Sequence, residues 1–238
     1  MRLDKLLANK GYGSRKEVKN LLKKKRVSVN GEYVKNSSQH IQPEVDIVMV
    51  DKEKINYQEF IYLMLHKPPG CISATEDKRH RTVLDLLKDE HRLFKPFPVG
   101  RLDKDTEGLL LITNDGELAH KLASPKKEID KVYYARIEGI VTSEDIESFQ
   151  SGVTLEDGYQ AKPAALKILH QGEISEIEVT VTEGKYHQVK RMFEAVGKKV
   201  IYLKRKQMGE LRLDERLSPG SYRELTEEEL DYCLSLKS

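Results

Sequence analysis

Residues 99–116 read VGRLDKDTEGLLLITNDG, and they combine a turn, a cluster of acids and an apolar strand. Gly100–Asp103 is typical of a tight turn, and the uncharged run Leu109–Thr113 predicts a strand buried on both faces. Asn114–Gly116 ends this strand with residues that favour turns. Carboxylates at positions 103, 105 and 107 precede the strand. The start of a buried strand would hold a catalytic carboxylate rigidly, although a loop that only caps a core strand can have the same composition.

Short apolar runs on both sides of this stretch predict further strands, and several helical patterns lie between them. Strands are expected at 61–65, 131–139, 164–169, 175–182 and 200–205. Helices are expected at 82–87, 117–123, 143–150, around 194–196 and from 226 onward. Short strands mixed with a few helices predict an α+β domain with a mixed, mostly antiparallel sheet and flanking helices.

The N-terminal part has a different pattern and predicts a separate small domain. Leu3, Leu6 and Leu7 share one helical face, and Ser14 with Glu17 forms a capping-box signature for a second helix. A short strand follows, and Asn30-Gly31 is a strong hairpin signal. The polar residues 51–59, DKEKINYQE, suit a linker, so we expect a domain at 1–58 and a larger one at 59–238.

Positive charge is concentrated in this small domain. Residues 1–31 carry ten Lys or Arg and two acids, a charge of +8, which leaves −6 for the rest of a chain whose net charge is +2. A basic domain on a mildly acidic body predicts a polyanionic partner. The candidate residues for binding this polyanion are Arg2, Lys5, Ser14, Arg15, Lys16, Lys19, Lys23, Lys24, Lys25 and Arg26.

RLDKLLA followed by GSRKEVKNLLKKKRVSVNG resembles an S4 domain, a small RNA-binding module. The resemblance implies phosphate contacts of the kind that make binding salt-sensitive and largely independent of sequence. A lysine-rich helix with a solvated face would show a similar charge run, but not the order of these motifs.

Composition excludes several classes of protein. In 238 residues, no apolar run approaches the roughly 20 residues of a membrane span, and the N-terminus lacks the apolar segment of a secretory signal. Cys71 and Cys233 form neither a disulfide framework nor a metal-ligand spacing. We therefore expect a cytoplasmic protein with no membrane association, most simply a monomer.

Cofactor signatures are missing from the sequence. It contains no phosphate-binding loop, dinucleotide-binding glycine motif, zinc-binding HExxH, CxxC pair or GxSxG elbow, and its histidines are scattered. We expect no cofactor and no metal site. Carboxylate chemistry remains, in which an aspartate acts as an acid, a base or a nucleophile.

GRLDKDTEGLLLITNDG resembles the active-site motif of the RNA pseudouridine synthases, in particular their RsuA-like branch. KVYYARIEG and EGKYHQVKRMFEAVGKKVIYLKRKQMGELRL resemble the next two motifs of that branch, in the same order. With the S4-like head, the resemblance covers nearly the whole chain. It implies isomerisation of uridine to pseudouridine in ribosomal RNA without a cofactor.

By this resemblance, Asp103 is the catalytic aspartate, Tyr133 is the active-site tyrosine and Lys190 is the basic partner that keeps Asp103 charged. Many members of the family have Arg at the position of Lys190, and Lys lacks the bidentate fork of Arg. Leu203 matches an apolar position under the base, and Arg101 is placed to hold a phosphate or to help extrude the nucleotide.

Other charged residues are expected to play supporting parts. Asp105 and Glu107 would orient the loop or bind Arg101. A positive lining for the RNA would come from Lys67, Lys78, Arg79, Arg81 and Arg191.

Several alternatives stay open at this point. HKPPG, HRTVLDLL and RMFEAVG most resemble members of this branch that modify small-subunit (16S) rRNA, but members acting on large-subunit (23S) rRNA share the motifs. Asp103 could attack the ribose or remove a ribose proton. A non-catalytic RNA-binding or ribosome-assembly factor, or a hydrolase with paired carboxylates, would explain part of the pattern.

Overall fold

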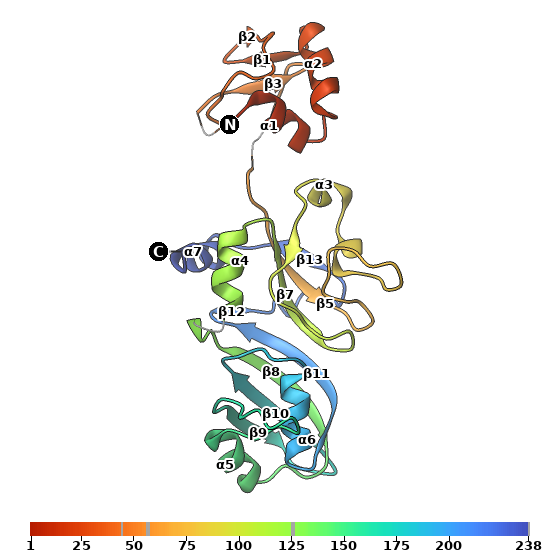
Figure 1. Ribbon diagram of the computed structural model, residues 1–238, viewed down its shortest axis with the longest axis vertical. Helices are drawn as coiled ribbons and strands as arrows, with labels where there is room; N and C mark the ends of the chain where they lie inside the picture. Colours follow the sequence, from red (N-terminus) through yellow and green to blue (C-terminus); the bar gives the residue numbers. More distant parts are fainter. Residues whose placement is uncertain (44, 56–57, 125–126, 238) are drawn as a thin grey trace. The chain divides into compact units, whose positions relative to one another are not determined.

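The computed structural model describes the chain from residue 1 to 237, except for residues 44, 56–57 and 125–126. The chain divides into two compact units (Figure 1). The first comprises Met1–Phe60 together with Lys88–Lys95, and the second comprises Ile61–Leu87 and Pro96–Ser238.

The first unit packs two helices on a small antiparallel sheet. In its described residues the sheet has the strand order β2-β1-β3-β4. Its elements are α1 (Leu3–Asn9), α2 (Arg15–Lys23), β1 (Val27–Val29), β2 (Glu32–Tyr33), β3 (Val48–Val50), β4 (Glu53–Lys54) and α3 (Asp89–Arg92). The sequence predicts the first two helices because their leucines and valine recur on one face, and these side chains are buried against the sheet.

Local signals set the ends of these elements. The predicted capping box is present, with the Ser14 amide donating to Glu17 Oε2 at 2.7 Å. The β1–β2 hairpin turns at Asn30 and Gly31, whose φ angles are 51° and 86°. The prediction that residues 51–59 form a linker is wrong at its start, because Glu53–Lys54 pairs with β3. Asn56 and Tyr57 lie outside the described residues.

The second unit is built on one large, twisted sheet (Figure 1). Among the described residues it has nine strands. Seven follow the order β13-β5-β7-β11-β8-β10-β9, while β12 pairs with β11 and β6 pairs with β7. The strands are β5 (Tyr62–Lys67), β6 (Phe97–Pro98), β7 (Glu107–Thr113), β8 (Lys131–Glu138), β9 (Ala165–His170), β10 (Ile174–Val181), β11 (Lys199–Met208), β12 (Leu211–Arg212) and β13 (Tyr222–Glu224). The pairings are antiparallel except between β7 and β11, so the expected mixed, mostly antiparallel sheet is confirmed.

The β7–β11 contact joins the two halves of the sheet, and it depends on Gly108. Gly108 is opposite Arg205 in the parallel ladder and has a φ of 108°. A Cβ added to Gly108 would lie 2.2 Å from the Arg205 carbonyl oxygen and 2.6 Å from its amide nitrogen. Only glycine combines this φ with so close a backbone approach.

Helices cover the sheet on its two halves. Leu109 and Leu111 of β7 pack with α4 (Gly116–Ala123) and α7 (Glu227–Ser235) in one buried apolar cluster. In the other half, α5 (Ser143–Ser151) packs on β9 and α6 (Gln188–Ala195) on β11. The helix expected at 82–87 is a short 3-10 turn, Val83–Leu86, where Asp85 caps the Thr82 amide.

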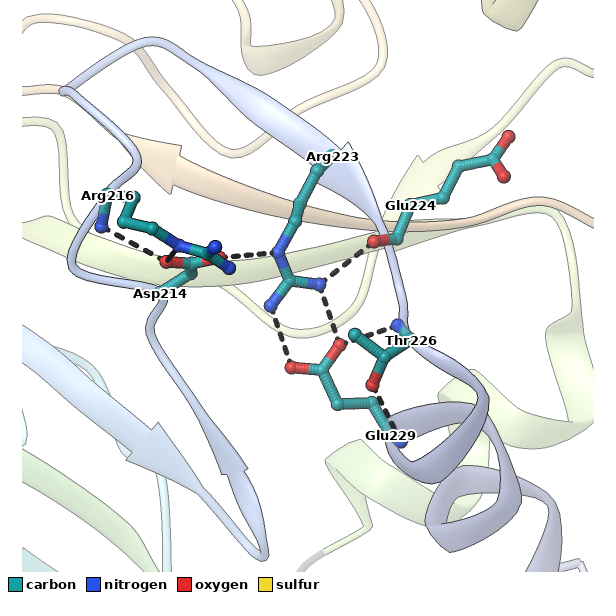
Figure 2. Close-up of polar contacts among 6 residues, drawn as sticks. All are labelled: Asp214, Arg216, Arg223, Glu224, Thr226 and Glu229. Carbon is teal, nitrogen blue, oxygen red and sulfur yellow. Dashed lines mark hydrogen bonds and ion pairs between the residues drawn. The ribbon is translucent and has the colours of Figure 1, made fainter.

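A charge network holds the C-terminal segment in place (Figure 2). Arg223 of β13 donates to both oxygens of Glu229 in α7, at 2.7 and 2.8 Å, and its Nε donates to Asp214 at 2.7 Å. Arg216 also binds Asp214. Arg223 lowers the pKa of Glu229, and Arg216 and Arg223 lower that of Asp214. These pairs hold the start of α7 against the edge of the sheet.

Among the described residues, no helix has both the length and the apolar composition that crossing a bilayer requires.

Gly108→Ala is expected to destabilise the second unit. Backbone strain costs about 1–3 kcal/mol and the clash with Arg205 a similar amount. Urea unfolding, followed by tyrosine near-UV circular dichroism, would measure the loss. Gly116→Ala is the matched control, because its added Cβ meets no atom within 4 Å and should be neutral or slightly stabilising. Equal stability of the two variants would contradict the role of Gly108.

Candidate active site

The loop before β7 carries Asp103, and a buried lysine holds this loop to β5. Lys67 ends β5 and is fully buried. Its Nζ donates to the carbonyl oxygens of Thr106 at 2.8 Å, Pro68 at 3.0 Å and Lys104 at 3.3 Å. The expectation that Lys67 helps line an RNA surface is therefore wrong. Its ammonium group instead binds the Pro68 carbonyl group and two carbonyl groups of the loop that carries Asp103.

Two further contacts fix the same loop from the segment after β5. Ser73 Oγ donates to the Leu102 carbonyl oxygen at 2.9 Å and accepts from the Leu102 amide at 3.0 Å. The Gly70 amide donates to the Lys104 carbonyl oxygen at 2.7 Å. The backbone on both sides of Asp103 is thus bound to residues 67–73, which limits where its carboxylate can lie.

Two basic side chains flank the Asp103 carboxylate: Lys190 of α6 and His187, the residue before this helix. Lys190 Nζ lies 3.4 Å from Oδ2, and His187 Nε2 lies 3.6 Å from Oδ1. The Asp103 side chain is 26% exposed and that of Lys190 16% exposed. The structure thus brings together Asp103 and Lys190, the carboxylate and the basic partner that the sequence suggested.

Lys190 also binds the second acid of the loop. Its Nζ donates to Asp105 Oδ1 at 2.6 Å. Burial raises the pKa of Asp105, but the hydrogen bond and charge of Lys190 outweigh this and bring it below its usual value. Glu107 accepts a hydrogen bond from Tyr202 Oη at 3.0 Å. These contacts replace the expected pairing of the two acids with Arg101.

His187 is the site residue that sequence reasoning missed. The scattered histidines of the sequence predict no metal site, and no motif spacing marks His187. The available signal was its position three residues before Lys190, which places both side chains on one side of a helix start. His187 has a left-handed backbone (φ 49°) and its ring stacks on Tyr186, with centroids 3.9 Å apart.

Hydrogen bonds within residues 183–188 shape this helix start. The buried Glu183 carboxylate accepts from Gln188 Nε2 at 2.6 Å, and Gln188 Oε1 accepts from the Lys185 amide at 2.8 Å. Tyr159 Oη also donates to Glu183, at 2.7 Å. This network sets where α6 begins, and therefore where His187 and Lys190 lie relative to the loop.

Asp103 lines a pocket together with three other residues that the sequence suggested for the site. Tyr133 of β8 and Leu203 of β11 line this pocket, as do Arg101 and Gly184. Tyr133 and Leu203 are both nearly buried, and Arg101 is exposed. A carboxylate beside an aromatic ring and an apolar side chain, with cations around it, can hold a planar base and act on the attached sugar.

The candidate RNA-binding residues lie in the first unit, and most of them are exposed. Arg2 and Arg26 are engaged within that unit: Arg2 binds Asp4 at 2.7 Å and Arg26 binds Asp51 through both carboxylate oxygens. Ser14 caps α2. The lysines and Arg15 therefore present most of the uncompensated charge.

Both units of the chain match known protein families. The family model for RNA pseudouridylate synthase matches residues 61–195, and that for the S4 domain matches residues 1–47. An uncharacterized RNA pseudouridine synthase of Bacillus subtilis, YtzG, is 54% identical over 97% of each chain. Ribosomal small subunit pseudouridine synthase A of Escherichia coli is 40% identical, covering 97% of this chain and 98% of its own. A crystal structure of a pseudouridylate synthase has a TM-score of 0.69 and 35% identity, over 98% of this chain and 99% of that one.

The pH dependence of stability tests the role of Lys67. Burial lowers its pKa to about 8, and nearby negative charges, including Asp105 and Asp103, offset only part of this effect. Between pH 8 and about 10.4 the unfolded chain holds a proton that the folded protein has lost, so folding becomes more favourable as pH rises. The stability of wild type relative to Lys67→Met should rise across this window by an amount on the order of 3 kcal/mol.

Urea unfolding of both proteins between about pH 7.5 and 10.5 measures this difference. Because the two proteins share every other titrating group, the effects of those groups cancel in the difference between wild type and Lys67→Met. A difference in stability that stays constant with pH would show that Lys67 is not buried as a shifted cation.

Proposed function

Because this chain belongs to the RNA pseudouridylate synthase family, we propose that it converts one uridine of small-subunit (16S) ribosomal RNA to pseudouridine, with Asp103 as the catalytic carboxylate and with no cofactor. The single observation that best supports the catalytic assignment is the position of Asp103. Its carboxylate lies between Lys190 and His187 in a pocket lined by Tyr133 and Leu203.

The isomerisation breaks the bond between N1 of uracil and C1′ of the ribose and forms a bond between C5 and C1′. The proton on C5 is lost and N1 regains one, so no atom is added overall. Asp103 either attacks the ribose or removes a ribose proton, and both roles need an ionised carboxylate. Lys190 Nζ lies 3.4 Å from this carboxylate and forms an ion pair with it.

The remaining pocket residues have roles that follow from their chemistry. Tyr133 can stack on the extruded uracil and its hydroxyl can relay a proton, while Leu203 supplies apolar contact. Arg101 is exposed at the pocket and can take the place of the base or bind a phosphate. Extruding a base costs a few kcal/mol, which contacts of this kind offset.

The choice of substrate rests on the relatives. Ribosomal small subunit pseudouridine synthase A of Escherichia coli and that of Yersinia pestis are 40% and 42% identical to this chain over 97% of its length. The S4 domain, with its exposed lysines, supports a structured RNA partner. Together these observations favour 16S rRNA over 23S rRNA.

Asp103→Asn should lower the rate of pseudouridine formation by about 10²–10⁴-fold, because the amide can act neither as base nor as nucleophile. The assay offers unmodified 16S rRNA, 23S rRNA and small-subunit assembly particles, and maps pseudouridine by carbodiimide adducts and primer extension. Asp105→Asn is the matched control: it alters the other Lys190-bound acid in the same loop and should keep much of the activity.

Three outcomes would contradict parts of this proposal. Full activity of Asp103→Asn would contradict the assignment of Asp103 as the catalytic carboxylate. Modification of 23S rRNA alone removes the substrate assignment. RNA binding by the wild type without conversion of any rRNA would favour a non-catalytic role.

A further inference from the structure

A second cavity lies next to the active-site pocket, and the two share part of their walls. We call it the basic cavity; its volume is about 250 Å³. Tyr133, Arg101 and Lys185 line both spaces. Two buried cations, Lys131 of β8 and Arg205 of β11, line the basic cavity and not the pocket of Asp103. None of the roles assigned above uses these two residues.

Arg205 has hydrogen-bonding capacity that the protein leaves unused. The residue is 3% exposed, and its Nε donates to the Leu109 carbonyl oxygen at 2.8 Å. Its Nη2 atom is buried and has no hydrogen-bond partner among the residues that the structure describes. A guanidinium group in this position normally binds a carboxylate or a phosphate, because a buried cation without a counter-charge is costly.

Lys131 adds a second buried cation close to the first. It is 7% exposed, and its Nζ donates to the carbonyl oxygens of Ile129 at 2.7 Å and Thr182 at 3.1 Å. These acceptors are neutral. Burial and the charge of Arg205 lower the pKa of Lys131, and Asp130 and Glu183 oppose this only in part. The two cations therefore repel each other in a region of low dielectric constant.

Glu183 is the acid that lines the basic cavity, and its oxygens are already engaged. Oε2 accepts from Tyr159 Oη, and Oε1 accepts from the Lys162 amide and Gln188 Nε2. Arg101 and Lys185, both exposed, add two further cations to the lining. Four cationic side chains thus face one carboxylate whose hydrogen bonds go elsewhere.

We propose that the basic cavity binds a phosphodiester group of the substrate RNA next to the target uridine, with Arg205 and Lys131 as its buried ligands. This inference rests on the proposed function for the identity of the ligand. The shared wall at Tyr133 places the cavity beside the pocket that takes the base, and an extruded nucleotide carries its own phosphates with it. A phosphate oxygen would accept from Arg205 Nη2 and reduce the repulsion between the two cations.

The first experiment measures anion binding by the protein alone. Inorganic phosphate should raise the thermal unfolding midpoint of the wild type relative to chloride at equal ionic strength, because a ligand that binds only the folded state stabilises it. Lys131→Met should lose most of this increase. Lys167→Met, which removes an exposed lysine from β9 of the same sheet, is the matched control and should keep it.

The second experiment changes the RNA and uses the wild-type enzyme, so it holds even if Lys131→Met fails to fold. Methylphosphonate linkages replace, one at a time, the phosphates around the target uridine. Neutralising a phosphate that flanks this uridine should lower kcat/KM by about tenfold, as expected for one lost charge-assisted hydrogen bond. Lys131→Met should show a much smaller effect of the same replacement, whereas Lys167→Met should behave like the wild type.

Results against the inference differ from results against the proposed function. Equal phosphate stabilisation of Lys131→Met and wild type, or an even effect of methylphosphonate at every position, would overturn the phosphate assignment. Phosphate binding that depends on Lys131, without any sensitive linkage in an active assay, would overturn the assignment to RNA. A wild type that converts no unmodified rRNA would refute the proposed function, and the phosphate comparison would still decide whether the cavity binds anions.

Discussion

The hydrogen bonds from the buried Lys67 ammonium to the loop that carries Asp103 are the interaction on which the candidate active site depends. A fully buried cation is unfavourable unless polar groups surround it, and here three backbone carbonyl oxygens do so. Two of these carbonyls belong to Lys104 and Thr106, directly after Asp103. Moving the loop would leave the cation only the Pro68 carbonyl oxygen of these three partners, so the cost of burying Lys67 favours one position of the loop and of Asp103.

The β7–β11 pairing brings the residues of β11 and β8 next to the loop that carries Asp103. β7 begins just after the catalytic loop, and β11 carries Leu203 and Arg205 and pairs on its other edge with β8, which carries Tyr133. The sheet therefore brings residues from three distant segments around one pocket. Because the backbone of Arg205 fits against position 108 only when that position is glycine, one residue without a side chain allows both halves to meet.

Exposed and buried positive side chains have different kinds of partner in this protein. The first unit presents exposed lysines suited to the sequence-independent contacts of a phosphate backbone. Two cations near Asp103 are partly or fully buried and have defined partners: Lys190 contacts two carboxylates, and Lys67 donates to carbonyl groups. Arg205 departs from this pattern, since one of its buried nitrogens has no partner in the described part of the chain.

Local patterns in the sequence determined most elements and several site residues. The capping box at Ser14, the Asn30-Gly31 turn and the uncharged run at Leu109–Thr113 each act over a few residues, so their physics is visible in the chain itself. Resemblance of motifs to a family then indicated Asp103 and Tyr133, which line one pocket, and Lys190, whose Nζ lies 3.4 Å from the Asp103 carboxylate. Lys67 was misread as a surface charge, His187 was missed, and the 82–87 helix proved to be a short 3-10 turn. These features, and the buried Nη2 of Arg205 that has no partner among the described residues, depend on which segments pack together, because burial and partners come from residues far apart in the chain. The sequence by itself determined which groups are available for chemistry, whereas only the tertiary structure decided which charges are buried and what they bind.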